Sequence, residues 1–226
     1  MINRILQTFA EVLKAKFALP GSASPEDQLK QPISAAIESA GGSFGLTVLS
    51  RTETHLSEHK VRPDVAIYVS GLICGYIELK APGLGADAPR LKGKHNKEQW
   101  EKLKSLPNLI YTDGREWALY RIGERKGAIV RFKDDPTDTG TAAITTENAD
   151  QLEALIRNFL FWSPTVPHKP SELASYLAPM TRFLRGEVEH ALSTSSSNVG
   201  LLATEWRQYF FPDADNASLL MPTPKP

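Results

Sequence analysis

The stretch RPDVAIYVSGLICGYIELKAPG, residues 62–83, decides how this chain folds. Its two apolar runs, 65–69 and 72–80, flank a Ser-Gly pair, which predicts two strands joined by a turn. Strand side chains alternate between the faces of a sheet, so Glu78 and Lys80 share one face, about 7 Å apart. Charged side chains are rarely buried unless they are paired or hold a metal. The second strand therefore indicates a site as well as a core.

An aspartate, Asp64, stands just before the first strand. It comes opposite Glu78 if Gly71 is the midpoint of the hairpin, and opposed side chains lie roughly 5 Å apart. This register requires a loop with an odd number of residues, such as a three-residue turn with a bulge glycine. A plain two-residue turn would place Asp64 on the other face of the sheet. The turn at Gly71 therefore decides whether the two carboxylates meet.

Two facing carboxylates have a definite chemistry. They favour a hard cation such as Mg²⁺, for which Mn²⁺ can substitute. A water on such a cation becomes a usable nucleophile near neutral pH, and the cation stabilises charge on a reacting phosphate. Lys80 would orient that water or balance the developing charge. The residues thus predict metal-dependent hydrolysis of a phosphate ester.

A known signature matches this arrangement. Pro63-Asp64, then thirteen residues, then Glu78-Leu79-Lys80 resembles the PD-(D/E)XK motif of restriction-type endonucleases. Residues 24–125 resemble more broadly the N-terminal nuclease region of single-chain restriction–modification enzymes, in which a nuclease is fused to an N6-adenine DNA methyltransferase. The resemblance implies a restriction-endonuclease-like fold and cleavage of double-stranded DNA with Mg²⁺.

The resemblance also implies roles for single residues. Asp64 and Glu78 would bind the metal, and the Leu79 carbonyl could complete its shell. The family commonly adds an acid from the helix that precedes the sheet, and Glu26 matches it, although a first-turn acid favours any helix. A glutamine on the helix after the strand is also common, and Gln99 matches it. The aromatic residue that usually follows four positions later is absent here.

The segment after the second strand is rich in cations. Five basic residues crowd eight positions: Arg90, Lys92, Lys94, His95 and Lys97. The whole chain has 26 basic and 26 acidic residues, so an anionic partner must be held by local clusters. The run is either a solvated charged face or a grip on the backbone phosphates of DNA, which salt would weaken. We take Arg90, Lys92, Lys94 and Lys97 as candidate DNA contacts.

Other functions compete with this interpretation. HLSEH, residues 55–59, matches an inverted zincin motif with His55 and His59 as zinc ligands, but it stands in a predicted loop and that chemistry needs a helix. GLGADA, residues 83–88, fits a dinucleotide fingerprint, but Pro89 obstructs the helix that should follow. A third alternative is a non-catalytic DNA-binding or interaction module that retains the nuclease fold.

The order of the elements predicts an α/β fold with a central mixed sheet flanked by helices. We expect a nuclease domain over residues 1–163 and a helical linker or appendage over 164–226. The first helix should end before Pro20-Gly21, and the second should run from the Ser24-Pro25 start to about Ala40 and stop at Gly41-Gly42. The remaining elements are a strand over 45–54, a helix over 94–106, a hairpin over 108–122, a strand over 127–133 and helices over 149–162, 171–193 and 199–211.

Composition bears on location. The chain has a single cysteine, Cys74, which suits a reducing compartment. Charged residues interrupt the N-terminal apolar pattern, which argues against a signal peptide, and no apolar run approaches 18 residues. We therefore expect a soluble cytoplasmic protein without a membrane partner.

The end of the chain departs from the resembling enzymes, which continue toward the methyltransferase after a Phe-Pro turn. Residues 218–226 do not follow that pattern. Codons that could encode these residues do give the pattern when they are read in another frame. We expect a truncated or frameshifted product of a longer gene. Methyltransferase, recognition or motor domains would then be partners absent from this chain.

Overall fold

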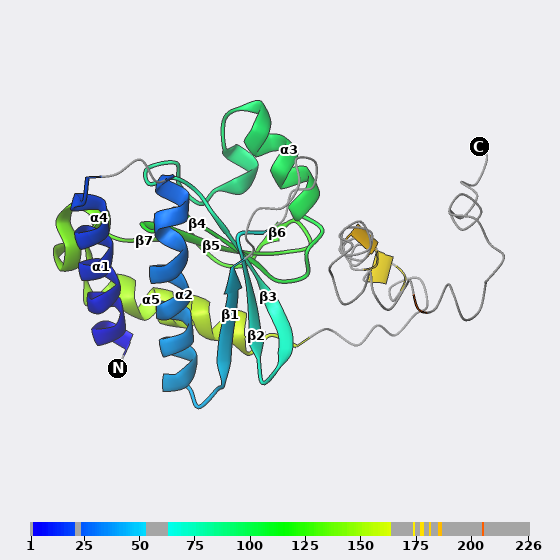
Figure 1. Cartoon of the computed structure of the whole chain (residues 1–226), viewed down its shortest axis with the longest axis horizontal. Coiled ribbons are helices and arrows are strands. Elements are labelled where there is room, and N and C mark those ends of the chain that lie inside the picture. Colours follow the sequence, from blue (N-terminus) through cyan, green and yellow to red (C-terminus); the bar gives the residue numbers. More distant parts are fainter. Residues whose placement is uncertain are drawn as a thin grey trace. The chain divides into compact units, whose positions relative to one another are not determined.

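The computed structural model describes residues 2–20, 24–52 and 63–163, together with seven residues near the C-terminus. The chain divides into two compact units, residues 1–167 and 168–226 (Figure 1). The seven residues described in the second unit are all helical: Ala174, Leu177, Ala178, Thr181, Arg185, Gly186 and Glu205. The rest of the predicted helices 171–193 and 199–211 lies outside the described residues. The domain boundary and the truncated end stay predictions.

A seven-stranded mixed sheet forms the centre of the first unit, in the order β1-β2-β3-β4-β5-β6 with β7 also paired to β5. The strands are β1 Val48–Thr52, β2 Val65–Val69, β3 Leu72–Leu79, β4 Leu109–Thr112, β5 Glu116–Arg121, β6 Glu124–Arg125 and β7 Val130–Arg131. Only the β3–β4 pair is parallel among these neighbours. The predicted α/β fold class, a restriction-endonuclease-like mixed sheet flanked by helices, is confirmed.

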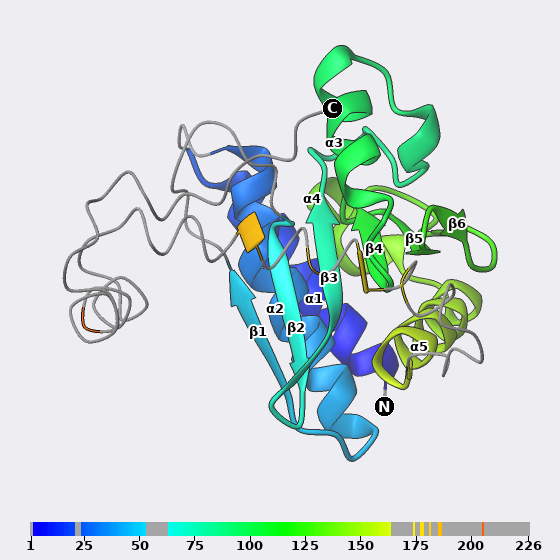
Figure 2. The ribbon, with the colours of Figure 1, turned by 90° about the vertical axis from the view of Figure 1, so that its right-hand side faces the viewer.

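Helices cover the two faces of the sheet unequally. They are α1 Ile2–Ala18, α2 Pro25–Ser43, α3 Lys94–Leu103, α4 Pro136–Thr139 and α5 Thr146–Leu160, with 3₁₀ turns η1 Ala88–Arg90 and η2 Gly140–Ala143. Apolar residues of α1, α2 and α5 pack with β2, β3 and β4 into one core. Trp100 and Leu103 of α3 form a second, smaller core with β4 and β5 on the other face. Figures 1 and 2 show the sheet between these layers.

The second helix ends later than predicted. Gly41 and Gly42 belong to its last turn. Residue 41 is a glycine because a Cβ there would lie 2.2 Å from Val48 Cγ2, so that only glycine lets β1 approach so closely. The residue that ends the helix is Gly45, with φ of +80°. The Leu46 N–H then donates to the Gly41 carbonyl (2.9 Å) and the Gly45 N–H to the Gly42 carbonyl (3.1 Å). These two bonds satisfy the last carbonyls of the helix in a Schellman motif.

The β2–β3 hairpin corrects the expected turn. Val69 pairs with Leu72, so the turn holds two residues, Ser70 and Gly71, both with positive φ. A bulge then shifts the register, because Tyr68 pairs with Ile73 whereas the preceding residue of β2 pairs with Gly75. The extra residue, Cys74, is buried in the main core. The bulge thus returns Asp64 to the face of the sheet that carries Glu78, which a two-residue turn alone would not do.

Other elements differ in extent. Residues 134–148 fall between two predicted elements, and they hold α4 and η2. Asp135 begins α4 by accepting the Thr137 N–H (2.9 Å). Thr145 and Asn148 form a capping box, so α5 begins three residues earlier than predicted. Within the described part of the chain, no helix is both long and apolar enough to cross a membrane.

Candidate active site

The β2–β3 pairing brings the two predicted carboxylates together. Val65 pairs with Ile77 and the two strands are antiparallel. The residue before Val65, which is Asp64, therefore comes opposite the residue after Ile77, which is Glu78. The Leu79 N–H donates to Asp64 Oδ2 at 2.9 Å, which fastens the aspartate to β3. The predicted register is therefore present, although a bulge produces it and not the turn.

Glu78 is the most buried acid of this group, with 1% of its surface exposed. Its Oε1 accepts from Lys80 Nζ at 2.8 Å and from Gln99 Nε2 at 2.5 Å. Its Oε2 is buried and has no hydrogen-bond partner among the described residues. Burial and the nearby Asp64 charge raise the pKa of Glu78 to about 8, against the opposing effect of Lys80. One oxygen of this carboxylate thus stays available for a cation.

Lys80 lies in the same buried cluster and is 2% exposed. Its backbone N–H donates to the Thr112 carbonyl at 2.9 Å, which continues the parallel pairing with β4. Its Nζ donates to Glu78 and to Gln99 Oε1, and lies 5.8 Å from the ring centroid of Tyr111. The ammonium group is therefore held at a fixed place beside Glu78 and Gln99.

Gln99 links the Glu78 carboxylate to the Lys80 ammonium group. It lies on α3, is 9% exposed, donates to Glu78 and accepts from Lys80. The next residue, Trp100, packs edge-on against Tyr111 and Tyr120 with centroids 5.8 and 4.9 Å apart. Packing of this aromatic cluster fixes the helix and so fixes the amide. The resemblance matched Gln99 to this position, and the structure brings it to the site without the aromatic residue of the family pattern.

The first turn of α2 faces the same end of the sheet. Glu26 Oε1 accepts the Ala81 N–H at 3.2 Å, directly after Lys80. Its charge is near enough to add to the rise in the pKa of Glu78. Lys30, one turn further on, lies 2.6 Å from Asp27 and 3.5 Å from Asp64. Burial lowers the pKa of Lys30, but the two aspartates outweigh it and the pKa rises.

A divalent cation fits the donors that converge here only in part. The unpartnered Glu78 Oε2 and the adjacent Asp64 supply the hard oxygen ligands that Mg²⁺ prefers. In the described ranges, no three His, Cys, Asp or Glu side chains gather closely enough to hold a metal ion by themselves. Two carboxylates are therefore the core of the candidate site. The roles of Glu26 and the Leu79 carbonyl as further ligands stay predictions.

The predicted DNA contacts lie on one exposed segment, which runs from η1 into α3. Arg90, Lys92, Lys94 and Lys97 are all exposed. Arg90 is 86% exposed at its side chain and lies 3.7 Å from Asp87, and Lys94 is 90% exposed and lies 3.8 Å from Glu98. Such loose surface pairs leave most of the cationic surface free for an anion.

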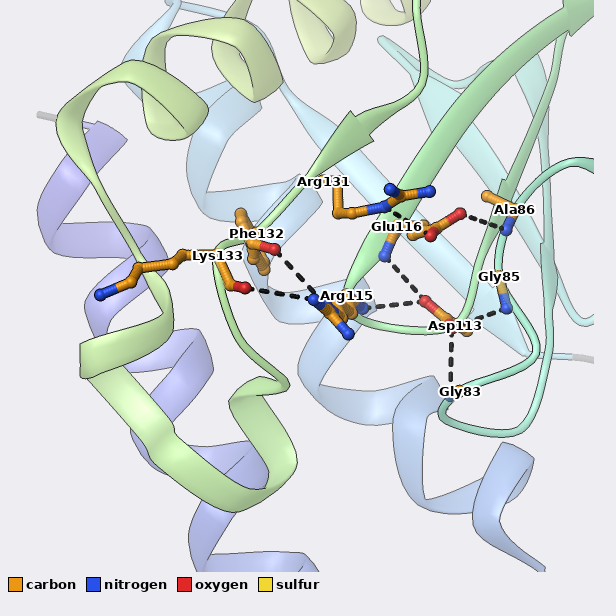
Figure 3. Close-up of polar contacts among 9 residues, drawn as sticks. All are labelled: Gly83, Gly85, Ala86, Asp113, Arg115, Glu116, Arg131, Phe132 and Lys133. Carbon is orange, nitrogen blue, oxygen red and sulfur yellow. Dashed lines mark hydrogen bonds and ion pairs between the residues drawn. The ribbon is translucent and has the colours of Figure 1, made fainter.

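The glycine-rich segment 83–88 does not form a nucleotide site. Its N–H groups already donate to two carboxylates, that of Asp113 in the turn between β4 and β5 and that of Glu116 at the start of β5, as Figure 3 shows. Asp113 Oδ2 accepts from Gly83 at 3.1 Å and from Gly85 at 2.8 Å, and Glu116 accepts from Ala86 at 3.3 Å. The segment runs into the three-residue 3₁₀ turn η1, and the next α-helix, α3, begins only at Lys94. The competing HLSEH motif, with His55 and His59, lies outside the described residues.

Three residues near the site were not predicted. Lys30 is four residues after Glu26 and so shares its helix face, a spacing that could have identified it. Tyr111 lies directly beside Glu78 in the parallel register of β3 and β4, which sequence alone does not give. Asp113, 2% exposed, accepts four backbone N–H groups, two from its own turn and two from the loop after Lys80. Asp113-Gly114 is the turn of the predicted hairpin 108–122, but no local pattern predicts the contact of Asp113 with the loop.

Comparison with known proteins gives little further information. No protein-family model matches the chain. No curated protein matches it either. Among solved structures, it is similar to a chain of the DrdV–DNA complex, determined by cryo-electron microscopy, with a TM-score of 0.47 and 19% sequence identity. That match covers 85% of this chain and 18% of the other, so the present chain spans less than a fifth of that protein.

Proposed function

We propose that this chain is a metal-dependent endonuclease that hydrolyses phosphodiester bonds of duplex DNA, as the nuclease part of a restriction–modification enzyme. One observation carries the proposal. A buried carboxylate oxygen without a partner, Glu78 Oε2, lies beside a second carboxylate, Asp64, and a buried ammonium group, Lys80. Buried polar atoms are rarely left unpaired, so this oxygen favours a cation ligand over a structural role.

The side chains divide the work of hydrolysis. Asp64 and Glu78 would hold Mg²⁺ or Mn²⁺, which when bound would activate water and stabilise the charge on the phosphate. Lys80 would orient the attacking water or stabilise the charge that develops on the phosphate oxygens. Gln99 keeps the Lys80 ammonium and the Glu78 carboxylate in register by bonding both. The exposed cations after β3 would hold the duplex by its backbone phosphates.

The alternative is a non-catalytic DNA-binding or interaction module with the same fold. Calorimetric titration with Mn²⁺ separates the two functions, because only the nuclease needs the carboxylate pair to bind metal. We expect the wild-type chain to bind Mn²⁺ and Asp64→Ala to lose that binding. Asp150→Ala, an exposed position on α5, is the matched control and should bind as the wild type does. Equal binding by wild type and Asp64→Ala would sink the proposed metal site.

A further inference from the structure

A second cationic feature lies where the loop after β3 meets the β5–β6 hairpin. Asp87 Oδ2 is 3.7 Å from Arg90 Nε and 3.6 Å from Arg125 Nη1. One carboxylate oxygen thus gathers two guanidinium groups from segments far apart in the chain. Since two positive charges meet one negative charge, the group keeps a net positive charge.

The backbone on both sides of Asp87 is buried in the core. The residues before and after Asp87, Ala86 and Ala88, are 0% and 2% exposed. The Tyr120 hydroxyl donates to the Ala86 carbonyl at 3.0 Å and accepts the Ala88 N–H at 3.0 Å. Most surface ion pairs are weak because both side chains must be ordered, but here the backbone of the acid is already fixed.

The loop that leads to Asp87 is fixed as well. Asp113, in the turn between β4 and β5, accepts the N–H groups of Gly83 and Gly85, and Glu116, at the start of β5, accepts that of Ala86 (Figure 3). Both glycines have positive φ, +87° and +84°. The loop therefore presents Asp87 and Arg90 from a defined backbone, which lowers the entropy cost of binding a ligand there.

Both guanidinium groups face solvent. The Arg90 side chain is 86% exposed and that of Arg125 is 43% exposed. A guanidinium group offers five N–H donors in a planar fork that matches phosphate oxygens, and Asp87 occupies only part of each. Two further exposed cations, Lys92 and Lys94, stand two and four residues after Arg90 in the chain.

We propose that Arg90 and Arg125, gathered by Asp87, form a two-arginine contact for one backbone phosphate of duplex DNA. The inference rests on the proposed function and extends it to the β5–β6 hairpin, where no DNA contact was predicted. The backbone phosphates of duplex DNA stand at regular spacing, so they match several neighbouring cations better than a single carboxylate would. Duplex DNA is therefore favoured over an acidic peptide.

Fluorescence anisotropy of a labelled duplex tests the contact, with the full chain in EDTA so that no cleavage intervenes. The affinity is measured between 50 and 200 mM salt, roughly the range over which phosphate contacts weaken most clearly. The variants are Arg90→Ala, Arg125→Ala and the double variant. Lys104→Ala is the matched control, because its side chain is also 43% exposed and is ion-paired, with Glu101. Circular dichroism confirms that each variant is folded.

We expect Arg125→Ala to weaken binding about 3- to 10-fold and to reduce the slope of log affinity against log salt by about 1, as for the loss of one phosphate contact. The double variant should lose less than the product of the single effects, because both arginines serve one phosphate. Lys104→Ala should change neither quantity.

Two outcomes would overturn the contact, and a third would overturn the proposed activity alone. If wild type binds duplex and Arg125→Ala behaves as Lys104→Ala does, the two-arginine contact is wrong while the endonuclease proposal stands. If oligoglutamate displaces the duplex as well as unlabelled duplex does, the surface recognises carboxylates and the contact is again wrong. If Arg125→Ala weakens binding but the wild type cleaves no DNA with Mg²⁺, the contact stands and the proposed activity fails.

Discussion

The Leu79 backbone N–H donates to Asp64 Oδ2 at 2.9 Å, and this one bond joins the start of β2 to the end of β3. It places Asp64 opposite Glu78, whose other neighbours are Lys80 and Gln99. Both carboxylates then lie at one end of the sheet, Glu78 beside Lys80 (2.8 Å) and Asp64 near Lys30 (3.5 Å). The proposed nuclease activity depends on this arrangement.

Glu78 predicts how stability depends on pH in metal-free buffer. Its pKa is about 8 in the native state against an ordinary value of 4.5. The native state therefore keeps a proton that the unfolded chain loses, so the contribution of Glu78 is fully present below pH 4.5 and is lost as pH rises to about 8. The unfolding free energy should fall over this window by on the order of a few kcal/mol. Urea unfolding at several pH values in EDTA measures it.

The control for that experiment is Glu78→Gln, which has the same shape and does not titrate. Its unfolding free energy should not show the fall that Glu78 contributes in the wild type. Parallel pH profiles for the two proteins would show that Glu78 ionises normally, and the account of its burial would then be wrong.

Tyr111 predicts a gain in stability. Its hydroxyl is buried and has no hydrogen-bond partner among the described residues. Tyr111→Phe removes that group and keeps the ring that faces Lys80 and Trp100, so it should raise the unfolding free energy by about 1 kcal/mol. Tyr111→Leu loses the ring contacts and should lower it by about 1–3 kcal/mol. Equal destabilisation by both variants would mean that the hydroxyl has a partner.

Gly75 predicts a loss of stability at the bulge. A Cβ there would lie 2.5 Å from the Asn108 carbonyl oxygen and 2.7 Å from Phe159 Cε2. Gly75→Ala should therefore lower the unfolding free energy by about 1–3 kcal/mol through overpacking. Gly42→Ala is the control, since a Cβ there meets nothing within 4 Å, and it should raise stability by about 0.5–1 kcal/mol as a helical alanine. A harmless Gly75→Ala would disprove the close approach of β3 to Asn108.

Local patterns predicted the strands, the main helices and the residue types of the site. The period of two in β3 put Glu78 and Lys80 on one face, and the structure agrees. The register to Asp64 was given for the wrong reason, because it depends on a bulge that local sequence does not encode. Cys74 turns inward there, its Sγ 3.2 Å from the Phe159 carbonyl oxygen, a contact across 85 residues.

Other features also depend on long-range packing. The predicted end of α2 was wrong because Gly41 is a glycine that makes room for Val48 and not one that ends the helix. The positive φ that follows the helix belongs to Gly45. Asp113 was read as a turn residue, but its second oxygen binds the loop after Lys80. Arg125 carried no local signal at all, since its partner Asp87 belongs to another segment. Local spacing thus predicted which residue types form the site. The residues that each of them contacts could be identified only from the three-dimensional structure.

Cleavage of supercoiled plasmid tests the central claim most directly. Wild type and Lys80→Ala are incubated with Mg²⁺ or Mn²⁺, with Lys104→Ala as the control for loss of one positive charge. We predict that the wild type and Lys104→Ala nick or linearise the plasmid, that EDTA stops them, and that Lys80→Ala is at least about 100-fold slower, as for loss of a group that acts on the proton or charge of the reaction. Equal rates for wild type and Lys80→Ala, or no cleavage by the wild type with either metal, would contradict the account.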